Sequence, residues 1–185
     1  MSVTTLDSRT ALVVIDLQRG IVALPTAHPA DEVVARSARL AAAFRKAGLP
    51  VVLVNVTGGA PGRTDGGPAA SRAFPEGWTE LVDELDRQPS DITVSKQQWG
   101  AFYGTGLDLE LRRRGVTQIV LCGISTSIGV ESTARDAYEH GYNVTVATDA
   151  VTDMDAAAHD RAVTTIFPRL GETGAAADIL ALLPA

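Results

Sequence analysis

The sequence predicts one doubly wound α/β domain, with a six-stranded, mainly parallel sheet and helices on both of its faces. Apolar runs rich in β-branched residues alternate with amphipathic segments along the chain. Strands that are apolar throughout are typical of a parallel sheet that helices cover on both sides. The length of 185 residues, with no internal repeat and no linker, is that of one domain over residues 1–185. We therefore expect a Rossmann-like architecture.

The first strands and the first helix follow from their apolar patterns. Ala11–Asp16 (ALVVID) and Pro50–Val56 (PVVLVNV) are continuous apolar runs, which predict buried strands. Between them, apolar residues at helical spacing predict a helix over Asp31–Ala47, which Gly48 ends. The Gly/Pro-rich segment Gly58–Pro68 has no periodicity, and we expect it to form a long loop that acts as a lid.

The rest of the chain continues this alternation of strands and helices. The same criteria predict, in order, a short helix at Trp78–Arg87, a strand at Asp91–Lys96, a helix at Leu107–Arg114, a strand at Thr117–Gly123, a helix at Ile128–His140, a strand at Asn143–Asp149, a helix at Asp155–Phe167, a strand at Arg169–Glu172 and a helix at Ala175–Leu183. In such sheets the ligand binds beyond the carboxyl ends of the strands. Asp16, Lys96 and the turn over residues 123–129 all lie at such ends, so we expect them to form one site.

The composition argues against some classes of function. The formal net charge of −6 and the pI of about 5.0 disfavour a nucleic-acid-binding protein, which usually has a basic face. No apolar run approaches the ~18 residues of a membrane span, and the first residues lack the pattern of a signal peptide. We therefore expect a cytoplasmic protein that binds neither nucleic acid nor a membrane. The single cysteine, Cys122, lies inside a predicted strand, where a buried apolar role is expected rather than a nucleophilic one.

Two charged residues end predicted strands. Asp16 follows an apolar run, and partial burial there would raise the pKa of its carboxyl toward the working range of an acid or base catalyst. The alternative for Asp16 is a capping or loop aspartate. Lys96 ends the third predicted strand, and a lysine close to Asp16 would lower that pKa and hold developing negative charge. The alternative for Lys96 is a solvated side chain at a strand end.

Three motifs connect the chain to a known family. The segment Ile119–Tyr138 (IVLCGISTSIGVESTARDAY) resembles the G-[VIA]-x-T-x-x-C-V-x-x-T-A signature of the isochorismatase-like (cysteine hydrolase) superfamily. Its matching residues are Gly123, Ile124, Thr126, Val130, Thr133 and Ala134. The segment VIDLQ, with Asp16 and Gln18, resembles the superfamily's D-x-Q motif. The segment VSKQQWGAF, with Lys96, resembles K-x-x-x-S-A-F, and Gly100 stands in place of the serine.

The resemblance implies an active site without its usual nucleophile. The superfamily's cysteine falls at position 129, where this chain has Gly129, so no acyl-enzyme can form there. The resemblance also implies a cis peptide between Ile124 and Ser125, with the backbone N–H groups of Ser125 and Gly129 as an oxyanion hole. The alternative for this segment is an ordinary βα turn with Ser127 as the helix N-cap.

These motifs define the candidate site residues. We assign catalytic roles to Asp16, Lys96 and Gly129, and substrate binding to Ser125, Gln18, Trp99 and Phe102. Trp99 and Phe102 follow Lys96 closely and would form the apolar wall of a pocket for a planar or cyclic substrate. The alternative for these two aromatic residues is packing in the core.

With a glycine in place of the cysteine at position 129, the chain resembles the isochorismatase branch of the superfamily. That resemblance implies hydrolysis of a vinyl ether or a related small cyclic substrate, with Asp16 as the general acid. Asp16 would protonate the methylene carbon, and water would capture the resulting oxocarbenium ion. Two alternatives stay open: a non-catalytic relative that binds a small molecule or has a structural role, and an amidohydrolase whose nucleophile is replaced at position 129.

No cofactor and no metal are expected. The superfamily's nicotinamidases bind metal through an aspartate and closely spaced histidines after the second strand, whereas His28, His140 and His159 are scattered here. Isochorismatases also bind substrate carboxylates through an arginine after the second strand. The candidates for that arginine in this chain are Arg63 and Arg72. The superfamily's members also imply a homo-oligomer, either a dimer or a tetramer.

Overall fold

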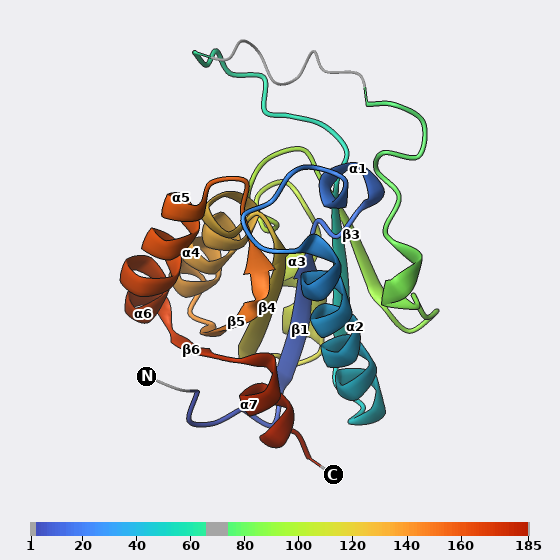
Figure 1. The fold of residues 1–185 in the computed structure, drawn as a ribbon. Helices are drawn as coiled ribbons and strands as arrows, with labels where there is room; N and C mark the ends of the chain where they lie inside the picture. The colour runs from blue at the N-terminus through green and yellow to red at the C-terminus, as the bar shows by residue number, and fades with distance from the viewer. Residues whose placement is uncertain (1–2, 66–73, 185) are drawn as a thin grey trace.

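The centre of the computed structural model is a six-stranded sheet whose paired strands all run parallel, in the order β3-β2-β1-β4-β5-β6. The structure describes residues 3–65 and 74–184. The strands are β1 (Thr10–Ile15), β2 (Val51–Val56), β3 (Ile92–Lys96), β4 (Gln118–Ile124), β5 (Asn143–Thr152) and β6 (Glu172–Gly174). The predicted α/β fold is confirmed, and the sheet reverses its strand order between β1 and β4 (Figure 1).

Helices and helical turns connect the strands. They are α1 (Arg19–Val22), α2 (Ala30–Lys46), the 3-10 turn η2 (Asp83–Leu85), α3 (Leu107–Arg113), the π-helical turn η3 (Thr126–Val130), α4 (Glu131–Glu139), α5 (Ala156–Arg161), the π-helical turn η4 (Ala162–Ile166), α6 (Phe167–Leu170) and α7 (Ala176–Ala181). In the described part of the chain, no helix combines the length and the apolar character that a membrane span requires.

The side chains of β1 alternate between two apolar layers. Val13 and Ile15 pack in the layer that includes residues of α3, α4 and α6. Leu12 and Val14 pack in the opposite layer, with residues of α2 and α7. Because β1 is fully buried on both faces, its continuous apolar run is the pattern expected of a central parallel strand.

The segment before β3 differs from its prediction. The expected helix Trp78–Arg87 is wrong, because only η2 is helical there, and Leu81 instead forms an antiparallel bridge with Gln18. Before Leu81 this segment is a series of turns, and backbone bonds such as Arg19 N–H to Glu80 O and Gly20 N–H to Trp78 O hold it against α1. Of the predicted loop Gly58–Pro68, residues 66–68 lie outside the described residues.

The end of the chain is shifted relative to the prediction. The expected strand Arg169–Glu172 is β6, at Glu172–Gly174, because the preceding helix continues through η4 into α6. Pro168 lies where the π-helical turn η4 continues directly into α6. A proline therefore does not end the helical region here.

Candidate active site

A buried ion pair joins the carboxyl ends of β1 and β3. Lys96, the last residue of β3, donates from Nζ to Asp16 Oδ2 at 2.7 Å. Asp16 follows β1 directly and has a positive φ of 52°, a conformation that few residues other than glycine adopt. The exposed fractions of Asp16 and Lys96 are 4% and 2%, so both charges are removed from water.

The environment of Asp16 raises the affinity of its carboxylate for a proton above that of an ordinary carboxylate. Burial raises the pKa of Asp16 to about 6, while the charge and the hydrogen bond of Lys96 act in the opposite direction. Asp16 Oδ1 is also buried and accepts no hydrogen bond from any residue that the structure describes. The ammonium group of Lys96 has further hydrogen-bond acceptors, because Nζ also donates to Trp99 O at 2.9 Å and to Gln98 O at 3.2 Å.

The turn after β4 brings backbone close to this pair. Gly123 has a φ of 118°, and a Cβ added there would lie 2.0 Å from Ile15 O, so only glycine permits this approach of β4 to β1. The peptide between Ile124 and Ser125 is cis, as expected. Side chains from the β5–α5 region fix the turn: Asp153 Oδ2 accepts from Ser127 N–H, and Thr126 Oγ1 lies 2.8 Å from His159 Nδ1.

Gly129 lies in η3 opposite the ion pair. A Cβ added to Gly129 would lie 3.2 Å from Asp16 Oδ2, 3.6 Å from Lys96 Nζ and 2.9 Å from Ile15 Cγ2. A side chain at position 129 would therefore point at the charged pair. Thr133 Oγ1 donates to Gly129 O at 2.7 Å and accepts from Ala101 N–H at 3.1 Å, which ties the loop after Lys96 to α4.

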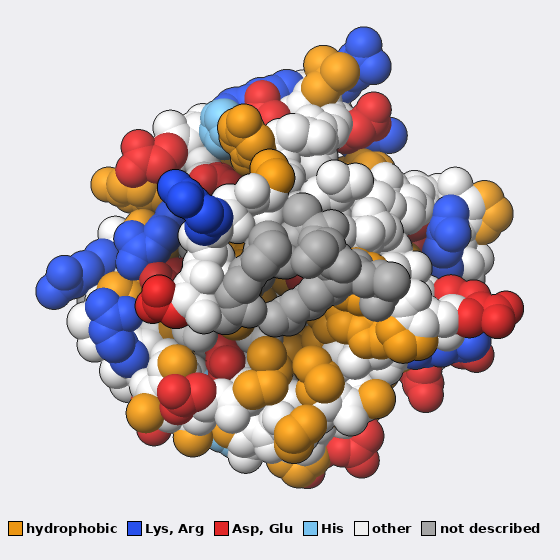
Figure 2. All heavy atoms as spheres, turned by 90° about the horizontal axis from the view of Figure 1, so that it is seen from above, with side chains coloured by type: hydrophobic (Ala, Val, Ile, Leu, Met, Phe, Trp, Pro, Cys, Tyr) orange, Lys and Arg blue, Asp and Glu red, His pale blue; other side chains and the backbone are white. Residues whose placement is uncertain are grey.

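A pocket of about 750 Å³ opens over these groups. Its floor includes Asp16, Lys96 and Gly129, and its walls are largely apolar. Figure 2 looks onto this end of the molecule, where hydrophobic side chains are gathered around the centre of the view. The volume and the apolar lining suit a small molecule rather than a polymer.

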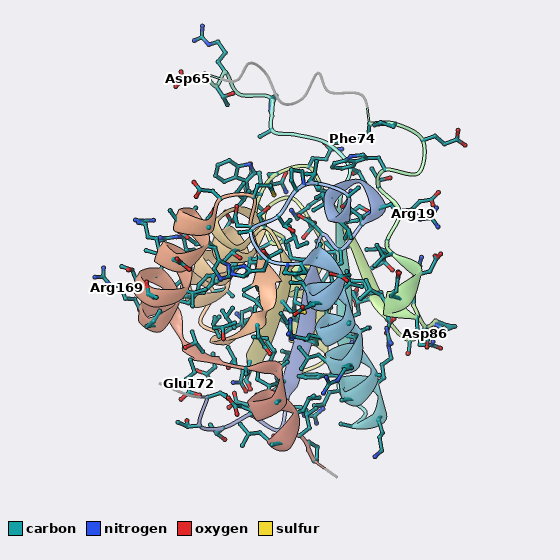
Figure 3. All side chains as sticks on the ribbon, in the orientation of Figure 1. Arg19, Asp65, Phe74, Asp86, Arg169 and Glu172 are labelled. Carbon is teal, nitrogen blue, oxygen red and sulfur yellow. The ribbon has the colours of Figure 1, made fainter. Side chains whose placement is uncertain are left out.

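Aromatic side chains from two segments line the pocket. Phe74 and Trp78 stack with their ring centroids 4.1 Å apart, and Figure 3 shows Phe74 above α1, at the end of the molecule opposite Glu172. Trp99 lines the pocket from the loop after β3 and is 65% exposed, so it presents a large apolar surface to solvent. These rings suit a flat or cyclic ligand.

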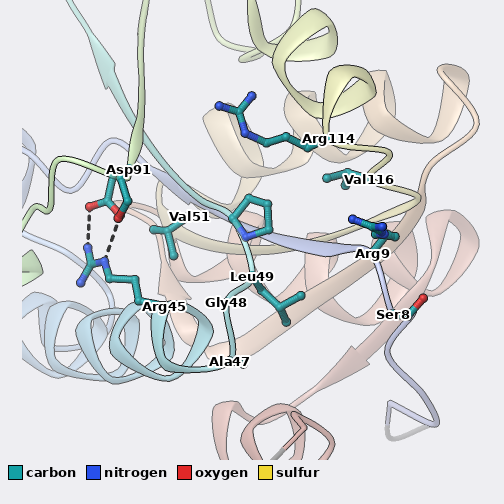
Figure 4. A pocket seen from close by; sticks show the side chains of 12 residues that line it. Ser8, Arg9, Arg45, Ala47, Gly48, Leu49, Val51, Asp91, Arg114 and Val116 are labelled. Carbon is teal, nitrogen blue, oxygen red and sulfur yellow. Dashed lines mark hydrogen bonds and ion pairs between the residues drawn. The ribbon is translucent and has the colours of Figure 1, made fainter.

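A second hollow, of about 570 Å³, lies at the amino ends of the strands (Figure 4). Arg45 lines it but is already paired with Asp91 at 2.8 Å, and Arg114 is paired with Glu110. It lies at the opposite end of the sheet from the Asp16–Lys96 pair, and we do not assign a function to it.

Within the described residues, no group of three or more His, Cys, Asp or Glu side chains is placed to hold a metal ion. His28 and His159 do lie together, with ring centroids 4.5 Å apart. The Nδ1 atom of His28 lies within hydrogen-bond distance of the Thr152 hydroxyl at the end of β5, and that of His159 lies within hydrogen-bond distance of the Thr126 hydroxyl in the turn after β4.

Comparison with known proteins agrees with this arrangement. The family model described as "Isochorismatase domain" matches residues 10–178. The chain belongs to the isochorismatase family. It is 49% identical over 179 residues to the isochorismatase family protein YecD of Escherichia coli O157:H7, covering 92% of this chain and 94% of that protein. A solved isochorismatase family protein from Burkholderia thailandensis has a TM-score of 0.93 and 48% identity, covering 98% of this chain and 99% of its own.

Another isochorismatase family relative has a named activity. The ureidoacrylate amidohydrolase RutB of Variovorax paradoxus is 33% identical over 184 residues, covering 84% of this chain and 73% of that protein. The family is hydrolytic, and RutB shows that it includes amidohydrolases.

The structure brings most of the predicted site residues together. Asp16, Lys96, Gly129, Ser125 and Trp99 all line the pocket over the carboxyl ends of the strands. The pocket lies where the strand order of the sheet reverses, between β1 and β4, which is where ligands of doubly wound sheets bind.

Gln18 and Phe102 do not line the pocket. Gln18 is fully buried, and its amide bonds to the backbone of Val56 and to Trp78 O, so it joins the end of β1 to β2 and to the segment before β3. Phe102 packs in the core, with its ring centroid 5.8 Å from that of Tyr142 and 5.2 Å from that of His140. Core packing, the alternative for Phe102, is what the structure has.

Several pocket residues were missed in the sequence. Ser132 and Asp136 line the pocket, and their spacing of three and seven positions from Gly129 places all three on one face of a helix. That spacing was a usable signal. Phe74, Trp78 and Met154 gave no comparable signal, because they reach the pocket through irregular segments whose path depends on tertiary contacts.

Proposed function

We propose that this isochorismatase family member hydrolyses a vinyl ether or a related small cyclic substrate without a cysteine nucleophile. The observation that carries the proposal is the Asp16 carboxyl. One of its oxygens is held by Lys96, the other has no partner among the described residues, and the space beside it is left open by Gly129. This arrangement keeps an acid and a cation beside position 129, where the resemblance places a thiol.

The proposed reaction needs only a proton and a water. Asp16 gives its proton to the methylene carbon of the vinyl ether, and the ether oxygen shares the positive charge of the resulting oxocarbenium ion. Water then adds to the carbon that bears the ether oxygen, which forms a hemiketal, and returns a proton to the Asp16 carboxylate. The hemiketal then breaks its C–O bond to give an alcohol and a carbonyl compound. Lys96 holds the Asp16 carboxylate in place after it has lost its proton.

The remaining pocket residues support binding in this proposal. The backbone N–H groups of Ser125 and Gly129 would bind an oxygen of the substrate at the floor of the pocket. Trp99 and the stacked pair of Phe74 and Trp78 would hold a ring between them.

The test is a panel of enolpyruvyl and simple cyclic vinyl ethers, with the carbonyl product followed by NMR. In D2O we expect one deuterium in the newly formed methyl or methylene group of the product, because the proton that is added comes from an exchangeable acid. Early time points avoid later exchange of the product. A wild-type protein that binds ligands but turns over no member of the panel would point instead to a non-catalytic binding protein.

A second candidate is an amidohydrolase whose nucleophile is replaced. The position of a Cβ at Gly129, close to Asp16 Oδ2 and Lys96 Nζ, favours it, because a thiol attached there would lie beside an acid–base pair. Its relatives in the family include ureidoacrylate amidohydrolases.

Gly129→Cys separates the two candidates. If the amidohydrolase candidate is correct, we expect amide hydrolysis that iodoacetamide abolishes. Because the new Cβ meets Ile15 Cγ2 at 2.9 Å, we also expect the free energy of unfolding to fall by about 1–3 kcal/mol. Gly129→Ala is the matched control, since it introduces the same crowding without a thiol. A folded Gly129→Cys protein without thiol-dependent activity on an amide panel would exclude this candidate.

A further inference from the structure

A second carboxylate lies in the same pocket, away from the Asp16–Lys96 pair. Asp136 and Ser132 lie one turn apart on α4 and both line the pocket. A Cβ added to Gly100 would lie 2.4 Å from Asp136 Oδ2 and 3.6 Å from Ser132 Cβ. The carboxylate of Asp136 therefore occupies the space that a side chain at position 100 would need, against the bare backbone of Gly100.

The Asp136 carboxylate has no partner in the described part of the chain. No hydrogen bond or ion pair to its side-chain oxygens is formed there, whereas its backbone oxygen accepts from His140 N–H at 2.9 Å. The side chain is half-buried, and burial raises the pKa of Asp136, while the nearby His140 acts in the opposite direction. A half-buried carboxylate without a donor is suited to accept hydrogen bonds from a ligand.

The charges around the pocket are uneven. Among the described lining residues, the charged side chains are Asp16, Lys96 and Asp136. Asp16 and Lys96 compensate each other at 2.7 Å, which leaves the charge of Asp136 uncompensated. Arg63 is not among the residues that line the pocket, and Arg72 lies outside the described residues. The described walls thus favour a ligand that carries a positive or hydrogen-bond-donating group and disfavour a carboxylate of the ligand near Asp136.

We propose that Asp136, with Ser132 beside it, determines specificity by binding an ammonium or other strongly hydrogen-bond-donating group of the substrate. This inference rests on the proposed function, because it names the substrate class for the same pocket. Gly129 and Asp136 are seven residues apart, roughly 10 Å along a helix. A six-membered ring that reacts beside Gly129 and carries a donor group at its far side has about that reach.

The proposal is tested by binding, which requires no turnover. The probes are benzylamine, benzyl alcohol and benzoate, which share one ring and differ in charge. Isothermal titration calorimetry at pH 7.5 gives their affinities for the wild-type protein, Asp136→Asn and Glu139→Gln. Glu139 is exposed at the end of the same helix, so Glu139→Gln removes the same charge outside the pocket.

We expect wild-type protein to bind benzylamine more tightly than benzoate. Asp136→Asn should weaken benzylamine binding by about tenfold, in the lower range for a hydrogen bond to a charged group, change benzyl alcohol binding by less than about threefold, and strengthen benzoate binding. Glu139→Gln should leave all three affinities unchanged. A second variant, Gly100→Ala, should weaken benzylamine binding as well, because its Cβ displaces the carboxylate.

Three results would overturn the proposal: a wild-type preference for benzoate, an unchanged ratio of benzylamine to benzoate affinity in Asp136→Asn, or equal effects of Asp136→Asn and Glu139→Gln. The proposed reaction fails on a different measurement, the vinyl ether panel. A protein that prefers benzylamine through Asp136 and cleaves no vinyl ether would therefore keep this inference and lose only the reaction.

Discussion

Replacing Asp16 by asparagine is expected to lower kcat by about 10²- to 10⁴-fold for any vinyl ether that the wild-type protein hydrolyses, which is the range that general acid catalysis contributes. Asparagine has nearly the same shape, and its amide oxygen can still accept from Lys96 Nζ, which lies 2.7 Å from Asp16 Oδ2. Asparagine lacks an acidic proton that could be transferred to the substrate. We therefore expect KM to change much less than kcat, because the walls of the pocket stay in place.

Asp86→Asn is a matched control for this variant. Asp16 and Asp86 are the described residues other than glycine that have a positive φ, 52° and 45° respectively. Asp86 is exposed and does not line the pocket, and Figure 3 shows it near η2. Asp86→Asn should keep full activity. An Asp16→Asn protein that retains wild-type kcat would remove Asp16 from the mechanism.

The same acid predicts how the rate depends on pH. Because the pKa of Asp16 is raised to about 6, its acid form is present below that pH and is lost above it. At pH 7 about one molecule in ten carries the proton. The kcat/KM of the wild-type protein should thus fall about tenfold per pH unit above roughly pH 6. A rate that rises over this range would show that Asp16 acts as a base instead.

Lys96→Met is expected to lower the free energy of unfolding by about 3–5 kcal/mol near neutral pH, the usual effect of breaking a buried ion pair. Methionine retains much of the apolar stem but leaves the Asp16 carboxylate buried without a cation. Lys96 opposes the effect of burial on the pKa of Asp16, so its removal should raise that pKa further above the value of the unfolded chain.

The direction of the pH dependence follows from that shift. A carboxyl whose folded-state pKa is raised contributes stability while it is protonated, and this contribution is lost as the pH rises through the folded-state pKa. The difference in stability between wild-type protein and Lys96→Met should therefore be larger at pH 8 than at pH 5. Urea unfolding at the two pH values measures it. A loss of stability that is the same at both would indicate lost packing rather than an unpaired charge.

The sequence was sufficient for the sheet and for the floor of the site. Continuous apolar runs placed β1, β2 and β4, since burial on both faces leaves a strand no polar position, whereas the sixth strand was predicted too early in the chain. Asp16, Lys96 and Gly129 were found because their backbone positions are set by strand ends and by one turn. Phe102 and Gln18 were assigned to the substrate although both are used internally, and neighbouring positions in a loop give no indication of which side chain turns inward. The segment around Trp78 was predicted as a helix, because its backbone bonds to α1 depend on contacts distant in sequence.

The bond network around Thr133 divides the site into two parts that can change separately. Thr133 Oγ1 bonds to Gly129 O and Ala101 N–H, so the loop that carries Lys96 and the turn that carries Gly129 are fastened to the same helix. The aromatic side chains of Phe74, Trp78 and Trp99 take no part in this network, although the backbone oxygen of Trp99 accepts from Lys96. Substitutions in the walls can therefore change which molecule is accepted while the acid and the cation keep their places, which is a route by which one scaffold can acquire new substrates.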